Sequence, residues 1–101
     1  MKIKSKKWIE RENLKTWRKD VLKRDDFKCQ ICNKKVNKPH VHHIIPKEFK
    51  ELKLDIMNGL TLCFNHHKVG RYSPHLNALW FYNWLKNNKP EQFKYLVTKI
   101  I

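Results

Sequence analysis

The sequence predicts a small α+β domain that is held together by a zinc ion. Two pairs of residues have the spacing of metal ligands, Cys29 with Cys32 and Cys63 with His66. A mostly β-branched stretch lies between these pairs, and apolar residues recur at helical spacing before and after them. At 101 residues the chain has the length of one domain, which we expect to span 1–101. A domain of this size buries a limited core, so a metal clamp would add needed stability.

The two pairs predict a structural zinc site. Each pair has two residues between its members, as in the knuckles that close on a tetrahedral zinc ion. Burial as small apolar side chains is the alternative for the cysteines, but all three fall at knuckle positions. Cys29 and Cys32 are also too close in sequence for an ordinary disulfide framework. We therefore expect a Cys3His site formed by Cys29, Cys32, Cys63 and His66.

The charge of the chain predicts a polyanionic partner. Lysine and arginine number 23 against 9 aspartates and glutamates, which gives a net charge of +14. Nucleic acid is the expected partner, and a merely solvated lysine-rich surface is the alternative. No apolar run approaches the roughly 18 residues of a membrane span. Residues 1–7 are basic but precede a charged segment instead of the apolar stretch of a secretory signal, so we expect a cytoplasmic protein without a membrane partner.

Helices are predicted on both sides of the zinc ligands. Residues 1–8 are expected to form a flexible basic arm. From about Ile9 an apolar stripe of Leu14, Trp17, Val21 and Leu22 predicts an N-terminal helix. We expect Trp17 to pack in the core over the zinc knuckle and not to stack on a base. Ser73-Pro74 predicts the start of the C-terminal helices, which should occupy 73–101 with a break at 87–90.

The segment between the knuckles predicts two strands and a short helix. Residues 41–45 form the first strand, ended by Pro46, and 60–62 form the second after a turn at Asn58-Gly59. Residues 47–57 should form a loop or a single helical turn. A helix should run from His66 to about Val69. His42 and His43 are neighbours on a strand, so they face opposite sides and should serve different roles, one on a metal and one on a water molecule.

These motifs resemble the HNH endonucleases, in particular the small stand-alone enzymes of phages and bacteria. The resemblance rests on Val41–Pro46, Asn58–Cys63, His66–Lys68 and the upstream Cys29–Cys32, within 29–68. It implies a ββα-metal (His-Me finger) core and hydrolysis of DNA. By resemblance, His43 is the general base, Asn58 orients the ring of His43, and His42 and His67 hold a catalytic divalent ion. The products would carry 5′-phosphate and 3′-hydroxyl ends.

Two positions depart from the commonest family pattern. His66 stands where most relatives have cysteine, which leaves an ordinary zinc ligand in place. His42 stands where the family has aspartate or histidine, and a neutral ligand favours Ni²⁺, Co²⁺, Mn²⁺ or Zn²⁺ over Mg²⁺ alone. The protein would act as a monomer or homodimer, and packaging or restriction proteins are possible further partners. The residues expected to contact the DNA backbone are Lys4, Lys6, Lys7, Arg18, Lys68 and Arg71.

Two other classes of function are open at this stage. A zinc-stabilised nucleic-acid-binding module without catalysis explains the zinc ligands and the charge, but it leaves His42, His43, Asn58 and His67 without a purpose. A structural protein of a phage particle has no support beyond the aromatic C-terminal helices. His40 and His75 lie outside the motif, and no role is predicted for them.

Overall fold

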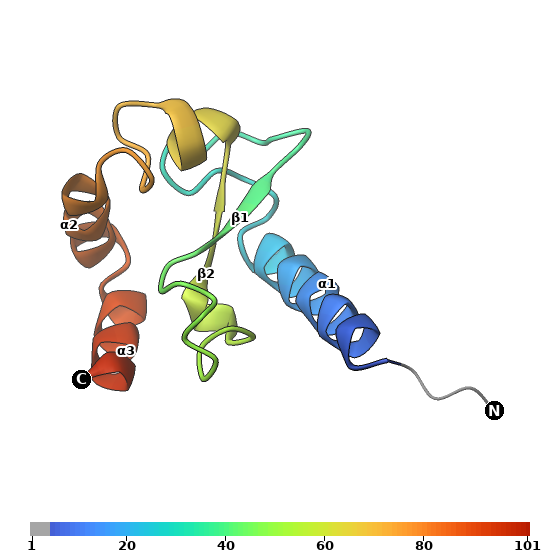
Figure 1. Cartoon of the computed structure of the whole chain (residues 1–101). Helices are drawn as coiled ribbons and strands as arrows, with labels where there is room; N and C mark the ends of the chain where they lie inside the picture. Colours follow the sequence, from blue (N-terminus) through green and yellow to red (C-terminus); the bar gives the residue numbers. More distant parts are fainter. Residues whose placement is uncertain (1–4) are drawn as a thin grey trace.

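A two-stranded antiparallel sheet lies between one long helix and a pair of shorter ones in the computed structural model, which describes residues 5–101 (Figure 1). Strand β1 pairs with β2 in a register that places His40 opposite Leu62 and His43 opposite Gly59. The expected small α+β fold is confirmed. The elements are α1 (Lys6–Arg24), β1 (His40–His43), η1 (Ile56–Asn58), β2 (Gly59–Leu62), η2 (Asn65–Val69), α2 (Ala78–Asn88) and α3 (Pro90–Ile100).

Helix α1 begins earlier than the apolar stripe predicts. The hydroxyl of Ser5 accepts a hydrogen bond from the backbone N–H of Trp8 at 3.1 Å, which caps the helix and lets it start at Lys6. The expected flexible arm is therefore wrong for residues 6–8, and residues 1–4 lie outside the described part of the chain. The stripe itself is confirmed, since Trp17, Val21 and Leu22 are buried.

Gly59 allows α1 to pack directly on the backbone of β2. A Cβ atom at Gly59 would lie 2.5 Å from a methyl carbon of Val21 and 2.8 Å from the indole of Trp17. Both distances are shorter than real carbon contacts, so any larger residue would push the helix away. The glycine thus sets how close Trp17 comes to the sheet.

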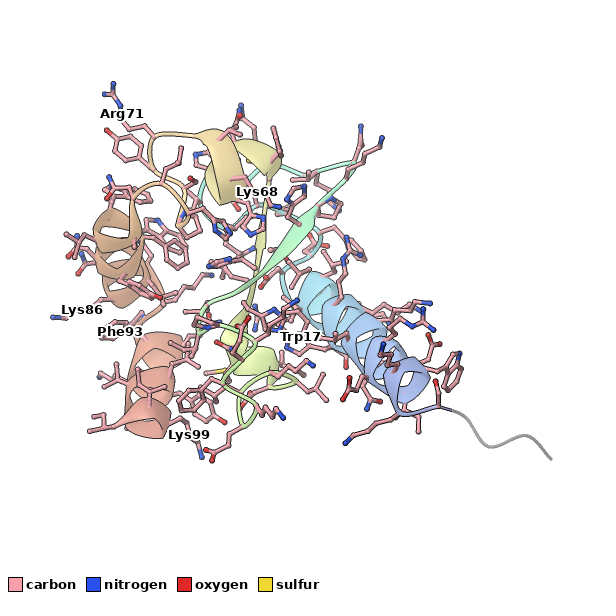
Figure 2. The ribbon with its side chains drawn as sticks, in the orientation of Figure 1. Trp17, Lys68, Arg71, Lys86, Phe93 and Lys99 are labelled. Atoms are coloured by element: carbon pink, nitrogen blue, oxygen red, sulfur yellow. The ribbon has the colours of Figure 1, made fainter. Side chains whose placement is uncertain are left out.

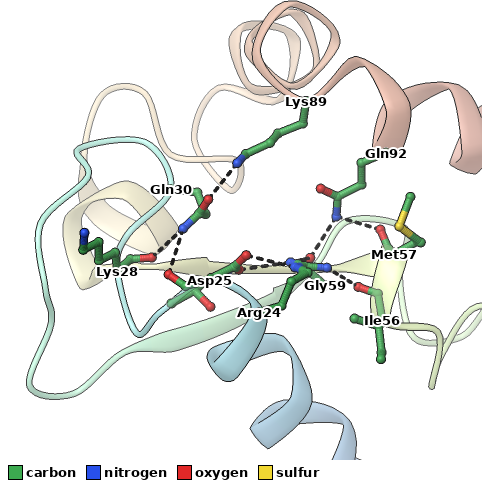
Figure 3. Close-up of polar contacts among 10 residues, drawn as sticks. Arg24, Asp25, Lys28, Gln30, Ile56, Met57, Gly59, Lys89 and Gln92 are labelled. Atoms are coloured by element: carbon green, nitrogen blue, oxygen red, sulfur yellow. Dashed lines mark hydrogen bonds and ion pairs between the residues drawn. The ribbon is translucent and has the colours of Figure 1, made fainter.

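A partly buried ion pair fastens the end of α1 to the second strand (Figure 3). Arg24 donates to the Asp25 carboxylate at 2.9 and 3.0 Å, and also to the carbonyls of Ile56 and Gly59, each at 2.7 Å. The same carboxylate accepts from the backbone N–H of Thr61 at 2.9 Å. Gln92 of α3 donates to the Gly59 carbonyl as well, at 2.9 Å. Helices far apart in sequence are therefore joined through one stretch of β2.

Helices α2 and α3 close the other side of the sheet. The prediction that a helix begins at Ser73-Pro74 is wrong, because the Ser73 hydroxyl accepts from Leu76 N–H at 3.3 Å and closes a turn. The helix begins at Ala78, where Asn77 caps it by accepting from Trp80 N–H at 3.1 Å. The core combines residues of these helices, of the sheet and of the loop after β1, namely Ile44, Leu52, Leu60, Leu62, Phe81, Leu85 and Leu96. No helix in the described part of the chain has the length and apolar character needed to cross a bilayer.

Candidate functional site

The four predicted zinc ligands come together at one end of the hairpin. The Sγ atoms of Cys29, Cys32 and Cys63 and a ring nitrogen of His66 all lie within 4.8 Å of one another. The Nδ1 of His66 is 3.2 Å from Cys63 Sγ and 3.8 Å from Cys29 Sγ. Three sulfurs and one imidazole nitrogen are the donor set of a structural zinc site, so these residues, called the zinc clamp below, could hold zinc.

The backbone forms the two knuckles by local hydrogen bonds. Asn33 adopts the left-handed conformation with φ 62°, and its N–H donates to Cys29 O at 2.7 Å, which turns the chain just past Cys32. At the second knuckle, His67 N–H donates to Cys63 O at 2.9 Å and starts η2. His67, which follows the last clamp residue His66, is thus held by the backbone of another clamp residue, Cys63.

A second cluster of side chains lies beside the clamp and consists of imidazoles alone. Nε2 of His67 is 3.1 Å from Nδ1 of His42 and also 3.1 Å from Nε2 of His75. One nitrogen of each ring lies within 4.8 Å of the others. His42 comes from β1, His67 from η2, and His75 from the loop that precedes α2. These three residues are called the imidazole cluster.

Burial keeps two rings of the imidazole cluster, those of His42 and His67, unprotonated. Desolvation, together with the nearby rings of His67, His75 and His43, lowers the pKa of His42 to about 3. Desolvation also lowers the pKa of His67 to about 4, with His75, His40 and Lys68 adding to the shift. At neutral pH these rings are therefore neutral and present lone pairs, which is the form that binds a metal ion.

The spacing and chemistry of the cluster fit a divalent transition metal. Nitrogens that share one ion tetrahedrally at 2.0–2.1 Å stand roughly 3.3 Å apart, close to the 3.1 Å found for the two pairs here. A single ring nitrogen carries at most one hydrogen, so Nε2 of His67 cannot donate to His42 and His75 at once. Three lone pairs that converge in this way suit a shared cation, and imidazole nitrogen suits Zn²⁺, Ni²⁺ and Co²⁺.

His43 does not join the imidazole cluster and is held by different contacts. Its ring stacks on Trp17, with ring centroids 4.0 Å apart and planes 9° from parallel. Its Nε2 lies 2.9 Å from the carbonyl oxygen of Lys53, so Nε2 carries the hydrogen and donates it. In the neutral ring, Nδ1 then has the free lone pair. Desolvation lowers the pKa of His43, and the hydrogen bond to Lys53 partly opposes that shift.

The Asn58 side chain contacts backbone and not the His43 ring, which corrects the role expected for it. Its Oδ1 accepts from Ile45 N–H at 2.7 Å, and its Nδ2 donates to the carbonyls of Ile45 at 2.9 Å and Leu52 at 3.1 Å. Asn58 is fully buried. Asn58 therefore holds both Ile45 and Leu52 in place. The residue after Leu52 is Lys53, whose carbonyl accepts the hydrogen bond from the His43 ring.

The histidines line a common hollow of about 430 Å³. Besides His42, His43, His67 and His75, its wall includes Lys47, Glu48, Lys68 and Tyr82. The imidazole cluster and the stacked His43 ring thus border one solvent-connected space. A phosphate group that entered this space would meet imidazoles and lysine ammonium groups together.

The sequence around these clusters resembles a known family. Residues 29–69 match the HNH endonuclease family model. The resemblance predicted from the sequence is thereby confirmed, and residues 29–69 are called the HNH segment below. Neither the comparison with curated proteins nor that with solved structures finds a match. The HNH segment implies a function on nucleic acid that involves a bound metal.

The HNH segment contains every residue of the zinc clamp and of the imidazole cluster except His75. The structure brings His42 and His67 together as expected, and it places His43 beside them in the same hollow. Two histidines that sequence reasoning left without a role also reach this site. His75 joins the imidazole cluster, and Nδ1 of His40 lies 2.9 Å from Nδ1 of His67. An unexplained histidine near the motif was the only signal in the sequence for either.

The predicted DNA-contacting residues are spread over several surfaces. Lys68 lines the hollow, and Arg71 projects from the loop that follows η2, away from the hairpin (Figure 2). Arg18 is exposed, and its guanidinium donates to Pro39 O at 2.8 Å, which ties α1 to the start of β1. Lys6 and Lys7 lie exposed on the first turn of α1. Lys4 falls outside the described residues.

Proposed function

We propose that this protein is a metal-dependent DNA endonuclease that hydrolyses phosphodiester bonds. The observation that carries the proposal is the meeting of the imidazole cluster and His43 in one hollow of the HNH segment. We also propose that residues 1–101 act as one nuclease domain, with a ββα-metal core formed by β1, β2 and η2 and with zinc in the clamp. A binding module alone would have no use for a neutral, stacked histidine next to three converging imidazoles.

His43 is the proposed general base. Its Nε2–H is committed to the Lys53 carbonyl, so Nδ1 is the atom that takes a proton from the attacking water. Burial lowers the pKa of this ring, so it is unprotonated at neutral pH and ready to accept. The stack on Trp17 holds the ring plane, which limits the entropy lost when water and base align.

His42 and His67 are the proposed ligands of the catalytic ion, as the family resemblance implies. A divalent ion held there would act as a Lewis acid that stabilises charge on the phosphate and on the departing 3′ oxygen. The residues themselves bring no negative charge, which favours Mn²⁺, Ni²⁺, Co²⁺ or Zn²⁺ over Mg²⁺. Asn58 acts one step further out by holding the loop whose Lys53 carbonyl orients His43.

The basic side chains near the hollow are proposed to bind the DNA backbone. Lys68 and Lys47 line the hollow and would meet the phosphates on each side of the cleaved bond. Arg71 and the lysines of α1 extend this surface. Binding by such contacts should weaken steeply as salt is raised, because bound phosphates release counterions.

The test is cleavage of supercoiled plasmid by the purified protein with a panel of divalent ions. We expect nicked or linear product with at least one transition ion and with 5′-phosphate ends. The His43→Ala variant should lose about 10²–10⁴-fold in rate, the usual contribution of a positioned acid or base, and should still bind DNA. Full cleavage by that variant would remove His43 as the base. Binding without cleavage under every ion would instead favour the non-catalytic module.

A further inference from the structure

We infer that His75, which lies outside the HNH segment, is a third protein ligand of the catalytic ion. The inference rests on the proposed function of the same site and adds a residue that the family motif does not contain. Nε2 of His75 lies 3.1 Å from Nε2 of His67, the same separation that His42 Nδ1 shows from that atom. His42, within the motif, and His75, beyond it, thus come equally close to Nε2 of His67.

The ring arrangement supports ligation over a chance contact. The rings of His42 and His75 have centroids 5.2 Å apart and planes at 78°, and His67 and His75 have centroids 4.8 Å apart and planes at 64°. Rings set at steep angles with one nitrogen of each pointing inward share a small central space. Stacked rings would instead place their nitrogens side by side, with no common point for a cation.

The loop that carries His75 is built to hold it there. Ser73 is fully buried, its N–H donates to Gly70 O at 3.0 Å, and its own carbonyl accepts from Asn77 N–H at 2.8 Å. These bonds anchor the chain two residues before and two residues after His75. The ring of His75 is itself exposed toward the hollow, so it reaches the cluster from the solvent side.

Cobalt binding tests the ligand role without relying on cleavage. Co²⁺ is added to the zinc-loaded full chain, and the visible ligand-field bands of an all-nitrogen site are followed; Co²⁺ in the zinc clamp would instead show intense sulfur-to-metal charge transfer in the near ultraviolet. We expect His75→Ala to weaken Co²⁺ binding at the nitrogen site by roughly 100-fold or more, since even an outer-shell partner typically contributes 10–100-fold. The control Leu76→Ala removes an exposed neighbour and should bind like the wild type.

The outcomes separate this inference from the proposed function. Unchanged Co²⁺ affinity in His75→Ala, with affinity lost in His42→Ala, overturns the ligand role and leaves the nuclease proposal standing. A raised KM for DNA at unchanged Co²⁺ affinity also overturns it, and would make His75 a substrate contact. Co²⁺ binding that depends on His75 in a protein that cuts no DNA upholds the ligand role while the nuclease proposal fails.

A different contact assigns a positioning role to His40. Its Nδ1 lies 2.9 Å from Nδ1 of His67, on the side of that ring opposite Nε2. If Nε2 of His67 binds the ion, Nδ1 must carry the hydrogen and donate it, so Nδ1 of His40 accepts. His40 thereby selects the tautomer and fixes the rotation of a metal ligand. A carboxylate or backbone carbonyl commonly does this, and here an imidazole takes its place.

Substitutions that keep or remove the accepting atom test this role. Asparagine places its Oδ1 where the Nδ1 of histidine stands, so His40→Asn should retain Co²⁺ affinity at the nitrogen site within a few-fold. His40→Leu should weaken it about 10–100-fold, with zinc content and Tm unchanged. Equal affinity in His40→Leu and wild type overturns the assignment, and so does an asparagine variant as weak as the leucine one.

Discussion

The imidazole of His43 lies flat on the indole of Trp17, with ring centroids 4.0 Å apart and planes 9° from parallel. The indole is fixed in turn, because its Nε1–H donates to the carbonyl of Asp55 at 2.8 Å. Trp17 belongs to α1, before the HNH segment begins. A helix outside the family motif therefore sets the plane of the residue proposed as general base.

Replacing Trp17 should slow catalysis more than it weakens substrate binding. In Trp17→Leu the His43 ring loses its flat support, and misplacement of about 1 Å can cost roughly 100-fold in rate. Trp17→Phe keeps an aromatic face and should lose less. Single-turnover cleavage of a defined duplex, with kcat and KM determined separately, checks this order. A leucine variant that is folded by circular dichroism and cleaves like the wild type would contradict it.

Asn58→Ala should destabilise the fold and disturb His43 together. The change leaves Ile45 N–H and the carbonyls of Ile45 and Leu52 without their buried partner. Unsatisfied buried groups cost about 1–3 kcal/mol, and urea unfolding measures that loss. Asn58→Asp retains the acceptor for Ile45 N–H but places oxygen against two carbonyls, so it should not restore stability. Wild-type stability in both variants would show that the loop is held by other means.

Removing Arg24 should expose the cost of a buried, unpaired carboxylate. The side chain of Asp25 is 5% exposed and that of Arg24 is 30% exposed. Arg24→Met leaves the Asp25 carboxylate with the Thr61 N–H as its remaining partner and should cost about 1–3 kcal/mol of unfolding free energy. Lys15→Met is the matched control, because its pair with Glu12 is solvent-exposed and contributes about 0.5 kcal/mol or less. Similar losses in the two variants would argue against the ion pair as the anchor of α1.

Acid should destabilise the protein through the imidazole cluster when no second ion is added. The folded-state pKa values of His42 and His67, about 3 and about 4, lie below the unfolded value near 6.5. The unfolded chain therefore binds more protons as pH falls, and stability that is complete above pH 6.5 is lost on the way to pH 3. His42→Leu cannot take up that proton and should lose less stability over the same range. Parallel stability curves for the two proteins would contradict the shift.

Loss of the zinc clamp should disable the second site, but the reverse should not hold. Cys63→Ser weakens the clamp that holds the start of η2, so the variant should lose both its zinc and its Co²⁺ binding at the imidazole cluster. His67→Ala removes one ring from η2 and should retain about one zinc per chain. Metal analysis after gel filtration checks both. Independent loss of the two metals would show that His67 is placed without the clamp.

Much of the site was predictable because it depends on the spacing of residues that are close in sequence. The pairs Cys29/Cys32 and Cys63/His66 and the strand that carries His42 and His43 depend on neighbours in sequence. The helix boundaries were less accessible: Ser73-Pro74 has the chemistry of a helix start, but the Ser73 hydroxyl closes a turn and Asn77 caps the helix instead.

The residues that the sequence did not reveal depend on how distant segments meet. His75 reaches the cluster because the loop after η2 folds back, and Trp17 reaches His43 because Gly59 lets α1 lie against β2. Neither contact is indicated by a periodicity or a residue spacing in the sequence. The partner of Asn58 was mistaken for the same reason, since the loop that it binds has no regular pattern between Pro46 and Asp55.

His66 and His67 are consecutive residues, and each belongs to a different cluster. An oxidant that attacked the three thiols would release a zinc ion held there, and the peptide bond between His66 and His67 would then be positioned less firmly. The proposed nuclease would then lose activity through thiols that take no part in the proposed reaction. Recovery would require a reductant and a supply of zinc, whereas replenishing the second ion alone would restore nothing.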